Sequence, residues 1–177
     1  MSDFTIVNGV AEIHDPKLYE SWIDREDYLA AVSASPSPEI AATKRLLVDF
    51  EAELARLVRD KTVQEDIVEV MTRFIGEDYI QRDPNARGNG RDAVIEHFRM
   101  VPLDRGVPPP VVNVSVDGEL AWVMMKQPMP DPEAPGKTYD WYILTVFRVR
   151  NGKLVEHWSA FQKMAAPMMP PPQPPSS

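Results

Sequence analysis

The dipeptide Asn151-Gly152 most strongly constrains the fold, because it separates two runs rich in β-forming residues. Asparagine and glycine both tolerate the positive φ angles that a two-residue hairpin turn requires. The sequence therefore predicts an antiparallel hairpin with one strand from Trp141 to Arg150 and a second from Lys153 to Gln162.

One face of this hairpin mixes polar with large apolar side chains. Successive side chains of a strand point to opposite faces. The expected face therefore carries Thr145, Phe147 and Val149 from the first strand and His157, Ser159 and Phe161 from the second. Polar groups among apolar ones indicate a lined pocket rather than a plain core.

Chain length, net charge and the absence of cysteine limit the classes of function that the protein can have. A chain of 177 residues can form one domain with its own core. The net charge of −8 argues against nucleic acid as a partner, since nucleic acid favours basic surfaces. The absence of cysteine excludes disulfides, a thiol nucleophile and thiolate zinc sites.

No signal peptide or membrane-spanning run is visible, so we expect a cytoplasmic protein without a membrane partner. His14, His97 and His157 are far apart and lack a metal-ligand motif, so no metal site is expected. No glycine-rich phosphate loop is present, and we expect no cofactor.

The chain divides into three parts. Residues 1–38 are expected to form an extension with a short helix from Pro16 to Ala31, which packs on the domain or on a second subunit. Alternatively, Trp22 or Tyr28 from this extension caps a pocket. Residues 39–165 form the main domain, and the Pro-rich tail 166–177 is expected to be disordered.

The main domain is predicted to be α+β. Apolar periodicity indicates helices over 39–60, 62–76 and 91–99, with a Thr62–Glu65 capping box and Gly76 as a C-terminal cap. Tyr79-Ile80 is a short extended piece, and strands are predicted over 111–117, 119–127, 141–150 and 153–162. Helices followed by antiparallel strands predict a curved sheet that wraps a long helix as a cone.

Several motifs resemble those of a known family. The run from Tyr79 to Asn85, followed by Gly90-Arg91, resembles the "YIQHNP…GR" stretch of SnoaL-like polyketide cyclases. The run from Phe147 to Trp158 resembles their "FRV.NGKIVEHWD" ending. Over roughly residues 40–163, the resemblance implies the cone-shaped, cystatin-like barrel of the nuclear-transport-factor-2-like superfamily, with a curved mixed or antiparallel sheet.

The sequence departs from this family at acid and base positions. Thr145 and Ser159 stand where the family has an inward acid or histidine and an aspartate. Neither is a useful acid or base near neutral pH. Arg82-Asp83 replaces the family's His-Asn pair. Either catalysis has moved to other residues, or the protein is not a cyclase.

The resemblance places Arg82 and Asp83 at the mouth of the cone. Arg82 would hold an enolate, phenolate or carboxylate, and Asp83 would move a proton; the alternative is a solvated turn pair. An inward His157 would act as acid or base, or else be a core or dimer contact. Tyr79 would donate to an oxyanion, or simply pack in the core.

Further candidates depend on which face of each strand is inward. Lys126 shares a face with Trp122 and Met124, and is either a buried cation with a lowered pKa or a surface lysine. Asp49, one helical turn from Glu53, either faces the pocket or solvent. The remaining expected substrate contacts are Tyr139, Trp141, Thr145, Phe147, Ser159 and Phe161.

Together, these features predict a cofactor-independent lyase or isomerase that acts on an apolar aromatic small molecule. The resemblance extends to bacterial lyases that remove formaldehyde from lignin-derived diarylpropane diols to give a stilbene. Alternatives are a polyketide cyclase or ketosteroid-isomerase-like enzyme, a ligand-binding protein without catalysis, and an interaction module. The outer sheet face, with Tyr142, Leu144 and Trp158, is expected to form a homodimer or higher homo-oligomer.

Overall fold

The computed structural model describes residues 4–7, 10–13, 37–86, 88–100, 109, 111–161 and 163. The expected helix from Pro16 to Ala31 and the Pro-rich tail lie outside these residues. Near the N-terminus, β1 (Phe4–Val7) and β2 (Val10–Ile13) pair as a small antiparallel sheet.

Three helices are found in the described residues: α3 (Pro38–Arg59), α4 (Val63–Phe74) and α5 (Arg91–Met100). Ser37 caps α3, because its Oγ accepts a hydrogen bond from the backbone N–H of Ile40 at 3.4 Å. The helix positions predicted from apolar periodicity are confirmed. No described helix is long and apolar enough to cross a membrane.

Two details predicted for α4 are wrong. Thr62 occupies the N-cap position but makes no side-chain cap hydrogen bond. Gly76 does not cap the helix, because α4 ends at Phe74 and the chain continues directly into β3 (Ile75–Gln81). Gly76 instead allows close strand packing, since an added Cβ would lie 3.3 Å from Val155 Cγ1.

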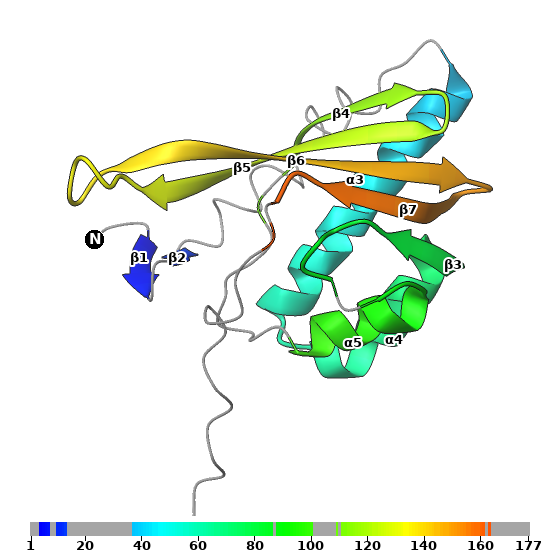
Figure 1. Ribbon diagram of the computed structural model, residues 1–177, viewed down its shortest axis with the longest axis horizontal. Coiled ribbons are helices and arrows are strands. Elements are labelled where there is room, and N and C mark those ends of the chain that lie inside the picture. The colour runs from blue at the N-terminus through cyan, green and yellow to red at the C-terminus, as the bar shows by residue number, and fades with distance from the viewer. Residues whose placement is uncertain are drawn as a thin grey trace, which may run out of the picture.

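The main sheet has the order β3-β7-β6-β5-β4. Its other strands are β4 (Val111–Asp117), β5 (Leu120–Pro130), β6 (Thr138–Arg150) and β7 (Lys153–Ser159). All pairs are antiparallel except β3 with β7. The predicted turn is confirmed, with φ of 51° at Asn151 and 69° at Gly152. The end of the β5–β6 hairpin extends well beyond the helices (Figure 1).

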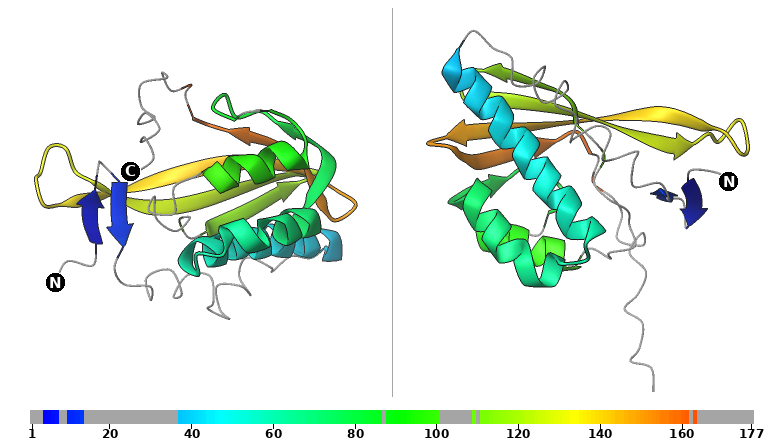
Figure 2. Two further views of the ribbon diagram at one scale, coloured as in Figure 1. Left: turned by 90° about the horizontal axis from the view of Figure 1, so that it is seen from below. Right: turned by 180° about the vertical axis from the view of Figure 1, so that it is seen from behind.

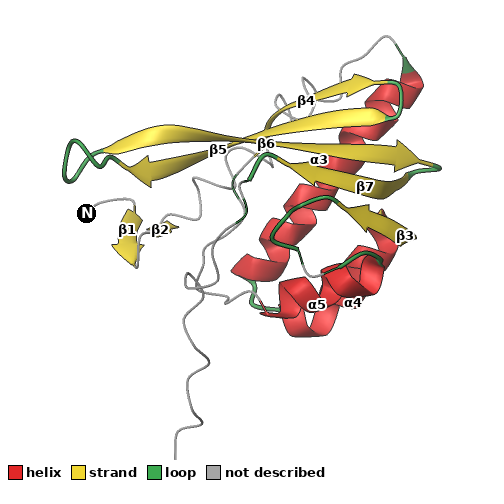
Figure 3. Cartoon of the chain, in the orientation of Figure 1, coloured by secondary structure: helices red, strands yellow, loops and turns green. Residues whose placement is uncertain are grey.

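The helices lie together on one side of this sheet (Figures 2 and 3). Phe50 of α3 joins the layers: its ring lies 5.5 Å from Phe74 of α4 and 6.0 Å from Phe147 of β6, between centroids. We call the sheet face that carries Phe147 the inner face and the opposite one the outer face. The α+β cone with a mixed sheet, as predicted, therefore has its core between α3 and the inner face.

Candidate functional site

Polar side chains from two neighbouring strands meet on the inner face. Thr145 and Phe147 of β6 lie opposite Ser159 and His157 of β7, respectively. Thr145 and Phe147 are buried, and His157 and Ser159 are half-buried. The ring of Phe147 stacks on the imidazole of His157, with centroids 4.8 Å apart.

The imidazole of His157 is held at both nitrogens. Its Nδ1 lies 2.6 Å from Gln81 Oε1, and its Nε2 shares a hydrogen bond with Thr145 Oγ1. The backbone N–H of Asp83 donates to the same Gln81 oxygen at 3.2 Å. Since that oxygen can only accept, Nδ1 carries a proton, and in the neutral ring Nε2 is the acceptor.

Burial lowers the pKa of His157 to about 4, although the carboxylate of Asp83 acts in the opposite direction. The ring is therefore neutral near pH 7. The single proton of the Thr145 hydroxyl is within reach of both Nε2 and the Trp158 carbonyl oxygen, which lies 3.0 Å from Oγ1. A neutral ring accepts this proton, whereas an imidazolium would donate to Oγ1 and direct the hydroxyl toward the carbonyl.

The most unusual ionisable group of the interior is Glu51 of α3. The residue is only 6% exposed, and burial raises the pKa of its carboxyl group to about 7. Within residues 37–86, 88–100 and 111–161, its carboxyl group has neither an ion pair nor a hydrogen bond. A buried carboxyl group with a raised pKa, and without a partner in the described part of the chain, is a candidate functional group.

Sequence reasoning missed Glu51, although a signal was present. It follows Leu47 by four residues and precedes Leu54 by three, so it belongs to the apolar stripe of α3. Asp49 was the expected carboxylate of this helix, but it is exposed because it lies off that stripe.

Tyr79 of β3 is 3% exposed and belongs to the same core. Burial, and then the charge of Glu51, raise the pKa of its phenol above the usual value. Tyr79 consequently keeps its proton across the physiological range and can act only as a hydrogen-bond donor to developing negative charge.

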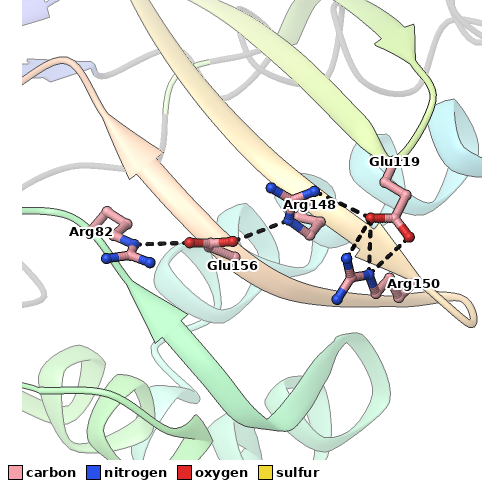
Figure 4. Close-up of polar contacts among 5 residues, drawn as sticks. All are labelled: Arg82, Glu119, Arg148, Arg150 and Glu156. Atoms are coloured by element: carbon pink, nitrogen blue, oxygen red, sulfur yellow. Dashed lines mark hydrogen bonds and ion pairs between the residues drawn. The ribbon is translucent and has the colours of Figure 1, made fainter.

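Arg82 and Asp83, which the resemblance places at the mouth of the cone, make separate contacts in the structure. The Arg82 side chain is 53% exposed, and its Nε donates to Glu156 Oε1 at 2.8 Å. Glu156 lies opposite Arg148 on the outer face (Figure 4). His157 follows it in β7, so its side chain points to the opposite face. Asp83 is half-buried and accepts a hydrogen bond from the Asn85 backbone N–H at 2.7 Å, as in a tight turn.

The face of β5 that carries Trp122, Met124 and Lys126 is the outer face, because Val123 and Met125 between them are buried. Lys126 Nζ lies 2.7 Å from Asp140 Oδ2, and this hydrogen bond raises the pKa of the lysine rather than lowering it. The structure thus separates these three side chains from the inner-face groups.

Only some of the aromatic side chains that we expected to contact the substrate lie in the interior. Trp141 is half-buried, packs against the core, and lies 6.1 Å from the ring of Phe161. Phe161 is 42% exposed and Tyr139 is 46% exposed. The inner face therefore carries Tyr79, Gln81, Thr145, Phe147, His157 and Ser159, and Glu51 of α3 is near enough to Tyr79 to affect the pKa of its phenol.

A small cavity of about 30 Å³ lies beside this group and is lined by Gln81, Ala86, Gly88, Ala93, Val94, His97 and Phe98. Its volume suits about two water molecules, at the ~10–15 Å³ that each requires. Among the described residues, no three side chains of the metal-binding types are grouped to hold an ion.

Helices on one face of a curved mixed sheet, with ionisable groups inside, define a nuclear-transport-factor-2-like protein. Residues 54–157 match the SnoaL-like domain, and the chain belongs to that family. Glu51 lies just before the matched segment. No curated protein gives a significant match to the sequence.

Several solved structures are similar in fold. A proposed polyketide cyclase from Acidithiobacillus ferrooxidans is 19% identical, covers 71% of this chain and 89% of its own, and gives a TM-score of 0.48. TsrD from Streptomyces laurentii is 16% identical over 67% and 86% of the two chains, with a TM-score of 0.45. IdmH, a proposed polyketide cyclase from Streptomyces antibioticus, is 18% identical over 62% and 87%, with a TM-score of 0.43.

Proposed function

We propose that the protein is a cofactor-independent enzyme that transfers protons on an apolar, carbonyl-bearing small molecule. The reaction class is that of a polyketide cyclase or a ketosteroid-isomerase-like enzyme. The proposal rests on one observation: Glu51 is buried, has no partner among the described residues, and has a pKa of about 7.

A carboxyl group with this pKa is suited to general base catalysis. It is ionised in a large fraction of molecules near neutral pH, yet it still binds a proton readily. Removal of a proton next to a substrate carbonyl would convert Glu51 to its neutral form, which its buried surroundings favour. The same group can then return the proton at another carbon.

Tyr79 supports this reaction as a donor to the enolate oxygen. Its phenol shares the interior with Glu51 and keeps its proton. A donor preorganised toward developing negative charge in a water-poor interior lowers the barrier to enolate formation. His157 is a further polar group of the inner face, and it would reach a substrate by exchanging its hydrogen bond to Gln81 or to Thr145.

The same residues would also serve carbon–carbon cleavage. Removal of formaldehyde from a lignin-derived diarylpropane diol requires an acid at the benzylic hydroxyl and a base at the terminal hydroxyl. Glu51 and His157 are the inner-face groups for these roles, in place of the family positions now occupied by Thr145 and Ser159. This lyase reaction is an alternative to the main proposal, because the diol has no carbonyl group, and aldol-type cyclisation is the reaction that we favour.

The outer sheet face is the surface that we propose for homodimer formation. Tyr142 and Leu144 are 49% and 50% exposed there, beside the half-buried Trp122 and Trp158. Light scattering after size exclusion would show a dimer for the wild type and a monomer for Leu144→Lys. A monomeric wild type would contradict this proposal.

The central experiment uses deuterium exchange. The wild-type protein is incubated in heavy water, without added cofactor, with an aryl ketone, a linear polyketone and a diarylpropane diol. NMR follows exchange next to the carbonyl and cyclised products, and absorbance follows stilbene. Exchange or cyclisation that is lost in Glu51→Gln but kept in Asp49→Asn supports the proposal, since Asp49 is an exposed carboxylate on the same helix.

Three other results of this experiment would point to a different role for Glu51 or for the protein. Wild-type rates in Glu51→Gln would overturn the role of the carboxyl group. Stilbene formation alone would favour the lyase form. No turnover of any substrate, together with binding seen by tryptophan fluorescence, would favour a ligand-binding protein instead.

A further inference from the structure

The end of β3 is fastened to β7 at three points. The backbone N–H of Arg82 donates to the carbonyl oxygen of His157 at 2.8 Å. On the inner face, Gln81 Oε1 lies 2.6 Å from His157 Nδ1. On the outer face, Arg82 Nε donates to Glu156 Oε1 at 2.8 Å. The neighbouring residues Gln81 and Arg82 of one segment therefore contact the neighbouring residues His157 and Glu156 of β7, with one side-chain contact on each face of the sheet.

The outer contact is part of a longer chain of charges (Figure 4). The Glu156 side chain is only 10% exposed and lies between Arg82 and Arg148, whose Nε donates at 3.1 Å. Burial alone would raise the pKa of Glu156, but the two arginines hold it below its usual value. Arg148 then contacts Glu119, which also binds Arg150.

The end of β3 has a short stretch of regular pairing with β7, in which Ile80 pairs with Glu156 and Gln81 pairs with His157. Its pairing with β7 is interrupted by a register shift between Ile75 and Ile80. On its other side, the strand bonds to the following turn: Gln81 N–H donates to Asn89 Oδ1 at 2.9 Å, and Gly90 N–H donates to the Tyr79 carbonyl at 2.6 Å. The side chains of Gln81 and Arg82 add contacts to this backbone frame, one on each face of the sheet.

We propose that Arg82 is a positioning residue, which acts from the outer face through Glu156 to hold Gln81 against the imidazole of His157 on the inner face. Gln81 in turn keeps the ring proton on Nδ1 and directs Nε2 to Thr145. Within the described residues, the Arg82 side chain bonds to Glu156 and not to the inner-face side chains. Its effect on catalysis rests on the proposed function, whereas its effect on the imidazole does not.

The ion chain provides a matched control. Arg150 binds Glu119 at the far end, with Nε at 2.8 Å from Oε1, and is exposed like Arg82. Arg150→Ala removes one arginine from the same chain without touching residues 81–83. In Arg82→Ala, Glu156 keeps its contact with Arg148, so its buried carboxylate is not left unpaired and the variant is expected to fold.

The test is nitrogen NMR of the imidazole rings in the full chain, with the His157 signal assigned from His157→Gln. In the wild type, we expect a neutral ring protonated on Nδ1 near pH 7. In Arg82→Ala, we expect signals averaged between the two tautomers and a midpoint of titration closer to that of an exposed histidine. Arg82→Lys should restore part of the wild-type pattern, and Arg150→Ala should match the wild type.

Spectra of Arg82→Ala that match those of Arg150→Ala would overturn the proposal. If the proposed function holds, kcat of Arg82→Ala should also fall by about 10-fold with little change in KM, as expected for a misplaced reacting group. A changed tautomer in a protein that shows no turnover on any substrate would leave the positioning role standing and overturn the proposed function instead.

Discussion

Glu51 of α3 and Tyr79 of β3 share one buried interior, and the negative charge of Glu51 adds to the effect of burial in raising the pKa of Tyr79. The two groups have complementary protonation states. Glu51 changes its charge near neutral pH, while Tyr79 keeps its proton. A base and a donor with pKa values this far apart suit proton transfer next to a carbonyl group.

Tyr79→Phe should lower kcat by about 10²–10³-fold, the usual effect of removing one donor to an oxyanion. The ring remains in the core, so the free energy of unfolding should change little. Steady-state kinetics and urea unfolding measure the two quantities. Unchanged kcat in a folded variant would show that the phenol does not reach the reacting oxygen.

Glu51 should also make the protein less stable as pH rises. Its pKa is about 7 in the folded protein and 4.5 as the ordinary value. The folded state therefore binds more protons between these values, and stability is full below pH 4.5 and is lost as pH rises through about 7. The difference corresponds to about 3 kcal/mol, at ~1.36 kcal/mol for each pH unit.

Urea unfolding of Glu51→Gln across this pH range tests that expectation. The variant should be more stable than the wild type above pH 7, by up to about 3 kcal/mol, relative to the difference between them at acid pH. Burial also raises the pKa of Asp49, so Asp49→Asn should show a change in the same direction, and a smaller one because this side chain is exposed. A constant difference between Glu51→Gln and the wild type would mean that the carboxyl group is not shielded from water.

His157 should act in the opposite direction. Its pKa falls from 6.5 to about 4 on burial, so the unfolded chain binds more protons in this range. Stability is consequently full above pH 6.5 and is lost as pH falls through about 4, by about 3 kcal/mol. The two losses run in opposite directions over nearly the same pH range, so they largely cancel in the wild type and become visible only in the single variants.

Unfolding of His157→Gln between pH 4 and 6.5 should lack this acid-side loss, while His97→Gln should retain it. His97 lies on α5, outside the His157 hydrogen bonds. An acid-side loss that persists in His157→Gln would assign it to other groups.

Local patterns in the sequence predicted most of the fold, because the turn at Asn151-Gly152 and the helix periodicities depend on neighbouring residues. The parallel pairing of β3 with β7 could not be predicted in this way, since it joins segments far apart in the chain. Gly76 shows the consequence: its close approach to Val155 is visible only once the strands are paired.

The site was harder to predict where both faces of an element look alike. Large apolar residues occupy both faces of β5, so alternation alone could not decide whether Trp122, Met124 and Lys126 point inward. The resemblance places Arg82 at the cone mouth. Its side-chain partner Glu156 belongs to β7, the strand next to β3, and could not be inferred from neighbouring residues. Glu51 is hard to predict because an acidic residue on a helix is usually exposed, although its position within the apolar stripe of α3 indicates burial.

Two hydroxyl groups that lie opposite one another on β6 and β7 differ in their hydrogen bonds. Thr145 Oγ1 bonds to His157 Nε2 and the Trp158 carbonyl, whereas Ser159 Oγ is buried without a partner among the described residues. Thr145→Val removes the hydroxyl at nearly constant volume and leaves Nε2 unpaired. It should lower the free energy of unfolding by about 1–3 kcal/mol.

Ser159→Ala removes a hydroxyl that has no partner to lose, so it should leave stability unchanged or raise it. Thr145→Ser keeps the hydroxyl and should retain the His157 NMR signature that Thr145→Val loses. Urea unfolding and nitrogen NMR measure both effects. Equal destabilisation by Thr145→Val and Ser159→Ala would mean that the cost arises from strand packing, and that the hydrogen bond from Thr145 does not hold the imidazole.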